Sequence, residues 1–383
     1  MNKSTPVCLL PIELLSSIFV LVVRDEIRDY YRAAKEDQTF FVNAPLRLSW
    51  VCQYFRAVVQ NTPQCWTFTQ MDAAKSIQER LLYYSLRWKQ MPGTVVAENA
   101  TFNGGSQRYT LMSLFPTGMV AEYVYRERAG ERASWSPVEL PMATKVIIHL
   151  RDIGEDSVRH GNWTQSFRYS SAPILVAEIY NCVLMDLPKT LEELKWSVRT
   201  SLRFHQLAAV ITLPNLRRLH LCHLTFATRA LMPRQNPLVN LTHLVLENMS
   251  CQLLRYLSPH LLPALRHLGL FDFAFAEDRL EMFIRGISSH LSFLDIVGPP
   301  ALQLSEWRPL LSAATNVVEL TIGIRGPVNV ISNRNFLEAL ADPTAGLPSL
   351  STLVIHSQLP YLPPAAFSDQ ISSIVGARQV TLA

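Results

Sequence analysis

Polar and apolar positions near the start of the chain follow a helical period. Between Ile12 and Val23 the polar side chains are Glu13, Ser16 and Ser17, which share one stripe of a helix because they lie three and four residues apart. The remaining positions of this segment are apolar on every other side. A surface helix of a monomer needs only one apolar stripe. The pattern therefore predicts a helix that buries apolar side chains against more than one neighbour.

A second helical pattern spans Leu46–Val59 and ends before Pro63, because proline disfavours helix in the residue before it. Its polar stripe consists of Ser49, Gln53, Arg56 and Gln60. The mixed-charge segment Arg24–Asp37 between the two patterns predicts a solvated helix or an ordered insertion. A unit this small buries its own core poorly. We expect its surplus apolar surface to be covered by the rest of the chain or by a partner.

The second half of the chain repeats the apolar spacing L-x-x-L-x-L. Its first positions are Leu191, Leu216, Leu241, Leu265, Leu291, Val317 and Leu350, so the steps are 25, 25, 24, 26, 26 and 33 residues. Weaker copies begin at Ile174 and Ala377. A period of this length predicts a solenoid of one strand and one helix per repeat, whose stacked strands share a core. L-x-x-L-x-L at this period resembles degenerate leucine-rich repeats.

Helical spacing returns between the predicted strands. Leu280, Phe283, Ile284 and Ile287 follow one helical face after two acidic residues, and Phe336, Leu337 and Leu340 follow Ser332, a candidate N-cap. Leu310 and Leu311 follow Ser305 in the same way, and Ser368–Gly376 predicts a last helix. Upstream, we expect a helix over Ser76–Trp88, strands over Thr94–Phe102 and Lys145–Leu150, and an exposed hairpin over Arg126–Ser134.

Composition narrows the protein class. The chain has 383 residues, of which 49% are hydrophobic and 17% charged, so it can bury a sizeable core. Its net charge of +4 is spread without long basic runs, which does not indicate nucleic-acid binding. The six cysteines form no C-x-x-C, which is typical of a reducing compartment. Pro11 and Glu13 interrupt the first apolar segment and argue against a signal peptide or membrane anchor. We expect a cytoplasmic or nuclear protein without membrane contact.

Candidate chemistry is sparse. The sequence contains no G-x-S-x-G, Walker, G-x-G-x-x-G or H-E-x-x-H motif, so we expect no enzyme and no cofactor. A histidine–cysteine cluster lies at His220–His223, with His243 and His267 in the next repeats, but no third zinc ligand has convincing spacing, and no metal is expected. Strand alternation places one set of side chains on the face opposite the core. This set, Arg218, His220, His243, Glu247, His267, Phe271, Phe293 and Asp295, is our candidate target-binding surface. It suits a polar, acidic or phosphorylated protein ligand; the alternative is an exposed sheet without a ligand.

The N-terminal segment resembles a known family. Leu10–Phe19 (LPIELLSSIF), followed by PLRLSWVCQYFRAVVQNTPQCW, is similar to the F-box pattern L-P-x-E-L-L-x-x-I-F, V-C-x-x-W-R, T-P-x-L-W. Phe55 stands where the family usually has Trp, and Cys65 where Leu is common. An insertion of about 25 residues separates the two blocks, as in fungal F-box-like proteins. The resemblance covers residues 8–68 and implies docking to the Skp-family adaptor, and through it the cullin, of a ubiquitin ligase.

Together these readings predict an α/β chain in which a three-helix F-box precedes a leucine-rich-repeat solenoid with strands on the concave and helices on the convex face. The expected domains are residues 8–68 with an insertion at about 24–44, an irregular linker at 69–141, and the solenoid at 142–383. The expected function is target recognition for an SCF-type ligase. The alternatives are a repeat scaffold without a ligase role and a secreted or membrane-tethered receptor. The expected adaptor-binding residues are Leu10, Pro11, Ile12, Leu14, Leu15, Ile18, Phe19, Leu48, Val51, Phe55, Val58 and Trp66.

Overall fold

The chain forms two compact units in a computed structural model. Unit 1 comprises Met1–Ile153 and Gly161–Glu178, and unit 2 comprises Gly154–His160 and Ile179–Ala383. The structure describes residues 6–35, 42–71, 83–84, 86–88, 91–98, 120–126, 143–149, 173–181, 187–198, 201–202, 204–226, 237–249, 253–254, 257–273, 277–297, 304–324, 330–342, 346–357, 372, 374 and 381–382.

Unit 1 begins with helices. Its helical elements are η1 (Pro6–Leu9), α1 (Ile12–Lys35), α2 (Ala44–Val51), α3 (Gln53–Gln60) and η2 (Pro63–Trp66). The charged segment expected to be a solvated helix or an ordered insertion is helical, but it is not a separate element, because α1 continues through it to Lys35. The prediction of a single helix over Leu46–Val59 is wrong, because two helices, α2 and α3, occupy this segment. Cys52 adopts extended backbone with φ −162° and ψ 170°, and its Sγ accepts a hydrogen bond from the Phe55 N–H, which starts α3 as a new helix.

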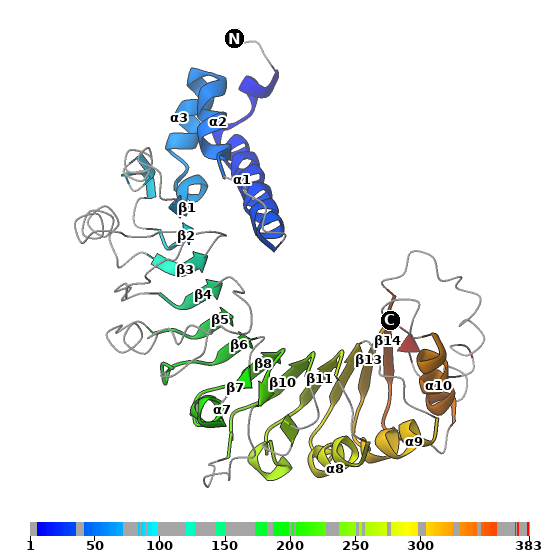
Figure 1. The fold of residues 1–383 in the computed structure, drawn as a ribbon. Helices are drawn as coiled ribbons and strands as arrows, with labels where there is room; N and C mark the ends of the chain where they lie inside the picture. The colour runs from blue at the N-terminus through cyan, green and yellow to red at the C-terminus, as the bar shows by residue number, and fades with distance from the viewer. Residues whose placement is uncertain are drawn as a thin grey trace. The chain divides into compact units, whose positions relative to one another are not determined.

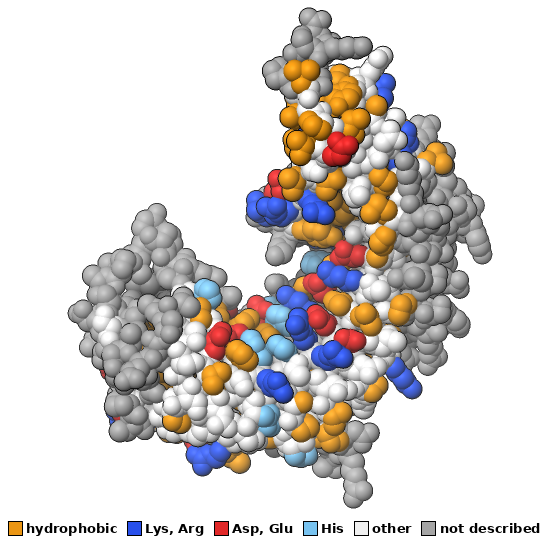
Figure 2. All heavy atoms as spheres, turned by 180° about the vertical axis from the view of Figure 1, so that it is seen from behind, with side chains coloured by type: hydrophobic (Ala, Val, Ile, Leu, Met, Phe, Trp, Pro, Cys, Tyr) orange, Lys and Arg blue, Asp and Glu red, His pale blue; other side chains and the backbone are white. Residues whose placement is uncertain are grey.

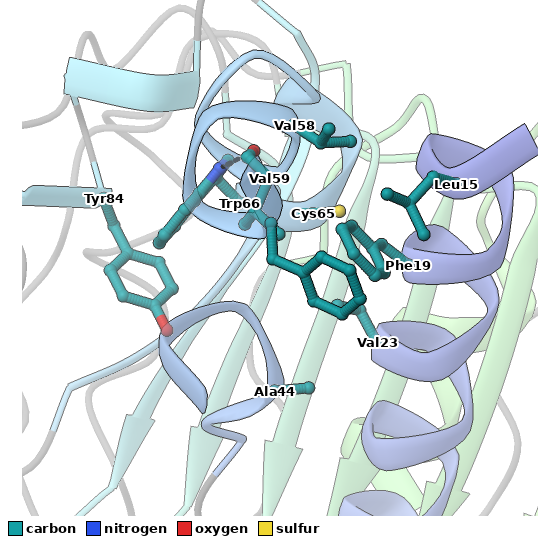
Figure 3. Packing of buried hydrophobic residues seen from close by; sticks show 10 residues of the cluster. Leu15, Phe19, Val23, Ala44, Val58, Val59, Cys65, Trp66 and Tyr84 are labelled. Carbon is teal, nitrogen blue, oxygen red and sulfur yellow. Dashed lines mark hydrogen bonds between the residues drawn. The ribbon is translucent and has the colours of Figure 1, made fainter. Parts of the chain in front are cut away.

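One stripe of α1 forms the core of this helical segment together with α2, α3 and η2. Leu15, Phe19 and Val23, four residues apart, face Val58, Cys65 and Trp66 (Figure 3). The rings of Phe19 and Phe55 meet edge to face at 4.9 Å, an arrangement that aromatic pairs favour. The buried indole N–H of Trp66 donates to the Val59 carbonyl at 2.8 Å. Every large side chain in this stripe is thereby packed or hydrogen-bonded inside unit 1.

Parallel strands follow the helices in unit 1. They are β1 (Phe68–Met71), β2 (Gly93–Glu98), β3 (Val120–Arg126) and β4 (Lys145–His149), paired in chain order. The strand expected over Thr94–Phe102 is confirmed as far as Glu98, and the strand expected over Lys145–Leu150 as far as His149, where the described residues end. β1 and β3 were not expected. β5 (Val176–Tyr180) comes next at the division between the units, and the N–H groups of Leu175 and Val176 donate to the Thr144 carbonyl.

The second half of α1 packs against this sheet. Tyr30 and Val42 form a buried cluster with Phe68, Val96 and Val124 from β1, β2 and β3. The rings of Tyr30 and Phe68 lie 5.4 Å apart, edge to face. α1 therefore packs both in the helical core and against the strands of unit 1.

Unit 2 repeats one parallel strand per marker. Each strand begins two residues after its marker: β6 (Glu193–Ser197), β8 (Arg218–Cys222), β10 (His243–Glu247), β11 (His267–Phe271), β12 (Phe293–Val297), β13 (Glu319–Ile324) and β14 (Thr352–Ser357). They pair in this order and end on β15 (Thr381–Leu382). A short pair, β7 (Ser201–Leu202) with β9 (Thr225–Phe226), lies beside them. All seven marker side chains are buried, because the strands stack them into a common core.

Helices of unit 2 lie along one side of these strands (Figure 1). They are α7 (Phe204–Ile211), the 3₁₀ turn η6 (Pro259–Leu261), α8 (Glu277–Ile287), α9 (Leu304–Ala313) and α10 (Val330–Ala341). The four apolar residues expected to face the core from α8 are all buried. α10 starts two residues before Ser332, and α9 starts one residue before Ser305, so neither serine is the expected N-cap. The fold is α/β with a parallel, solenoid-like sheet.

Some expectations fall outside the described residues. The hairpin expected over Arg126–Ser134 lies outside them after Arg126, which ends β3. Of the helix expected over Ser76–Trp88, residues 83–84 and 86–88 are described and are helical. Of the last expected helix, residues 372 and 374 are described, and both are helical.

Candidate functional site: an apolar helix stripe and a polar sheet face

A second stripe of α1 is apolar and exposed. Leu14, Ile18, Leu21 and Val22 recur at i, i+4, i+7 and i+8, next to the buried stripe that contains Phe19. Between 41% and 58% of each of these side chains is accessible. We call these four residues the exposed stripe. At the end of α2, Trp50 is 72% exposed, and Val51 beside it is exposed as well. Figure 2 shows hydrophobic side chains gathered over this helical part of unit 1.

The expected adaptor-binding residues divide between core and surface. The buried ones are Leu15, Phe19, Phe55, Val58 and Trp66, whereas Pro11, Ile12, Leu14, Ile18 and Val51 are exposed, and Leu10 and Leu48 are half-buried. The exposed residues that sequence reasoning left out are Leu9, Leu21, Val22 and Trp50. The helical angle places Leu21 and Val22 beside Leu14 and Ile18, so the signal was present in the sequence.

A buried carboxylate holds α2 against α1. Glu26 accepts hydrogen bonds from the backbone N–H groups of Asn43, at 3.0 Å, and Ala44, at the start of α2. Its second oxygen pairs with Arg47 at 2.6 Å. A carboxylate at a helix N-terminus satisfies orphan N–H groups and the positive end of the helix dipole. Glu26 was included in the charged segment Arg24–Asp37, but its hydrogen bonds to the start of α2 were not predicted.

The strands of unit 2 carry a second set of alternating side chains on the face opposite their buried leucines. Register places Arg218, His243, His267 and Phe293 in one column across β8, β10, β11 and β12. His220, Val245, Gly269 and Asp295 form the next column, and Cys222, Glu247, Phe271 and Val297 the third. These twelve residues are the polar sheet face. It contains all eight side chains expected to bind a target, and Figure 2 shows basic, acidic and histidine side chains close together in this region.

Histidine side chains pair within the first two columns. His267 Nε2 lies 2.7 Å from Asp295 Oδ2, and its ring is sandwiched between those of His243, at 5.2 Å, and Phe293, at 5.9 Å. Burial, the neighbouring His267 and Arg218 lower the pKa of His243. A lowered pKa keeps His243 neutral near pH 7. Arg218 pairs with Glu193 of β6 at 3.4 Å. Much of the charge on this surface is therefore already compensated.

A second histidine–carboxylate pair includes a thiol. His220 Nε2 lies 2.9 Å from Glu247 Oε2, and the Cys222 thiol donates to the same oxygen at 3.4 Å. The hydrogen bond from His220 holds the pKa of Glu247 down to about 2, and burial with the nearby Glu247 raises the pKa of Cys222 to about 12. The predicted neighbours His243 and His267 do stack, but neither belongs to this trio.

Comparison with known proteins does not assign this chain to a family. No protein-family model matches the sequence, and a search of curated proteins finds no match. Among the described residues, no helix combines the length and apolarity needed to cross a bilayer.

Proposed function

We propose that this protein is the target-recognition subunit of an SCF-type cullin–RING ubiquitin ligase. In this proposal the exposed stripe, with Trp50 and Val51, docks a Skp-family adaptor, and the polar sheet face of unit 2 binds a target protein. The protein itself carries out no chemistry, and ubiquitin transfer belongs to other subunits. The observation that carries the proposal is an apolar helix stripe left exposed next to a helical core that is already closed.

Burial energetics favour a protein partner for the exposed stripe. Covering a side chain of the Leu or Ile type is worth about 1.5–3 kcal/mol relative to full exposure. Four such side chains in one stripe give a contiguous apolar patch, a feature that marks interaction surfaces in soluble proteins. An exposed Trp is also the residue type most enriched among interface hot spots. The F-box-like spacing of the same segment indicates which partner to test.

The substitution of Phe for the family's usual Trp does not weaken this proposal. Phe55 is buried and packs edge to face on Phe19. It therefore alters the core of the helical segment and leaves the exposed stripe untouched. The insertion likewise lengthens α1 beyond the exposed stripe and includes Glu26, which anchors α2. Both departures are compatible with an intact docking surface.

Binding of the full chain to a purified Skp-family adaptor, measured by isothermal titration calorimetry, tests the proposal. The double variant Leu14→Glu plus Ile18→Glu places two charges in the exposed stripe and should abolish binding while unit 1 stays folded by circular dichroism. Met282→Glu is the matched control, because Met282 is 71% exposed on α8; it should bind like wild type. No binding by the wild-type chain, or equal binding by the double variant, contradicts the proposal.

A further inference from the structure

Three different metal-ligating side chains converge on the neighbouring strands β8 and β10. His220 and Cys222 are two residues apart on β8, so they share one face of the sheet, and Glu247 is the register partner of Cys222 on β10. Their Nε2, Sγ and carboxylate oxygen atoms all lie within 4.8 Å of one another. Sequence spacing alone does not reveal this set, because Glu247 comes from the next repeat.

The scaffold beneath these side chains is rigid. The residues between and beside them, Leu219, Leu221 and Leu246, are at most 1% exposed and fix both strands in the core. The ring of Phe271 on β11 meets His220 edge to face, with centroids 6.4 Å apart. A site built on paired strands keeps its geometry better than one on loops.

We propose that His220, Cys222 and Glu247 bind a zinc ion through Nε2, Sγ and a carboxylate oxygen. Imidazole, thiolate and carboxylate are the zinc ligands found in proteins, and three protein ligands with one open position are typical of sites that hold water or an exchangeable group. The site belongs to unit 2, whereas the exposed stripe belongs to unit 1, and it does not depend on the proposed ligase role.

The observed spacing is close to that of a tetrahedral site. Zinc–ligand bonds of 2.0–2.3 Å imply separations of about 3.4 Å between nitrogen and oxygen ligands and about 3.6 Å between sulfur and oxygen ligands. The observed values are 2.9 Å for His220 Nε2 to Glu247 Oε2 and 3.4 Å for Cys222 Sγ to the same oxygen. Small side-chain rotations open the first distance by about half an ångström, with no change in the strands.

Charge and protons balance on binding. In the metal-free trio the Cys222 thiol donates a hydrogen bond to Glu247. The ion takes the place of the thiol proton: the Cys222 sulfur–hydrogen bond breaks, the proton passes to water, and a zinc–sulfur bond forms. One thiolate and one carboxylate then neutralise the dication. Lys195 on β6 acts electrostatically on both Cys222 and Glu247.

Cobalt(II) replaces zinc as a spectroscopic probe in the test. The full chain is stripped with a chelator, and Co²⁺ is titrated in under reducing conditions. We expect one tightly bound equivalent and a thiolate-to-cobalt charge-transfer band, both reversed by added Zn²⁺. Cys222→Ser should lose the band, and Glu247→Gln should weaken binding about 10-fold or more, since even outer-shell partners of a metal contribute that much.

Matched controls locate the site. Cys52→Ser removes a partly exposed cysteine of unit 1, and His243→Gln removes a histidine of the polar sheet face outside the trio; both should bind cobalt like wild type. Absence of the band from the wild-type chain overturns the proposal whatever the variants do. A band that persists in Cys222→Ser also overturns it, because the ion is then bound elsewhere. Thermal melting confirms that each variant is folded.

Discussion

Glu26 and Arg47 lie 2.6 Å apart across the junction of α1 and α2, and the same carboxylate accepts the N–H groups that open α2. Glu26 is buried, whereas most of the Arg47 side chain is in solvent. The carboxylate therefore contributes chiefly through the backbone groups it satisfies, since exposed ion pairs contribute little.

Replacing Glu26 by Gln should destabilise unit 1. One amide oxygen cannot replace two carboxylate oxygens that serve Asn43, Ala44 and Arg47, so we expect a loss of about 1–3 kcal/mol in the free energy of unfolding. Chemical denaturation measures it. Asp29→Asn is the control, because Asp29 pairs with Arg32 in solvent and should cost less than about 1 kcal/mol. Equal losses in both variants would show that Glu26 does not anchor α2.

The two stripes of α1 should respond differently to truncation. Phe19→Ala removes a ring that is 2% exposed and should cost about 3–5 kcal/mol of folding stability. Leu21→Ala removes a side chain that is 58% exposed and should change stability by less than about 0.5 kcal/mol. Thermal or urea unfolding of both variants measures the difference. A large loss for Leu21→Ala would mean that the exposed stripe is already covered in the free protein.

Alkaline pH should weaken the helical core through Cys65. Burial raises the pKa of this thiol from its ordinary value of 9.0 to about 12. Because the folded-state pKa is the higher one, the contribution is complete below about pH 9 and is lost as the pH rises towards 12. The free energy of unfolding should fall more steeply over this range in wild type than in Cys65→Ala. Parallel slopes in the two proteins would contradict the assignment.

Thiol labelling gives an independent check on Cys65. The thiolate is the reactive form, and Cys65 is 1% exposed, so it should resist alkylation at neutral pH in the folded chain. Cys52, which is partly exposed, should react before Cys65. Peptide mapping after a timed reaction with iodoacetamide distinguishes the two, and denatured protein provides the reference for complete labelling.

Gly346 should tolerate no side chain. Its φ is +97°, and a Cβ atom built there lies 2.4 Å from the Leu311 carbonyl oxygen and from Ser312 backbone atoms. Gly346→Ala should therefore destabilise unit 2 by more than about 1 kcal/mol. Gly269→Ala is the comparison, because its Cβ would meet a Val245 side-chain atom at 3.1 Å and needs only a small shift. Differential scanning calorimetry should show the larger loss for Gly346→Ala.

Sequence patterns predicted the repeats of unit 2 well. The marker leucines are buried, and each strand starts two residues after its marker. Because side chains alternate between the two faces of a strand, the apolar positions determine which face is buried. The break at Cys52 was missed, since apolar spacing continued across it and a backbone turn leaves no trace in that period. β1 and β3 were also missed, because their repeats lack the L-x-x-L-x-L spacing.

The candidate sites were predictable only in part. Strand alternation placed His220 and Glu247 on one face, but their contact depends on the register between neighbouring repeats. In α1, the same apolar residue types occupy the buried and exposed stripes, so residue type could not separate Phe19 from Ile18. Their angular positions relative to Glu26 and Tyr30 do separate them, since those two residues mark the inward side of the helix.

α1 connects the exposed stripe rigidly to the strands of unit 1. It is one uninterrupted helix of 24 residues, about 36 Å long, and its far half is clamped to β1 by the Tyr30–Phe68 contact. No hinge separates the clamp from the exposed stripe. A molecule bound to that stripe would consequently have a fixed orientation relative to β1 and the strands that follow it in unit 1.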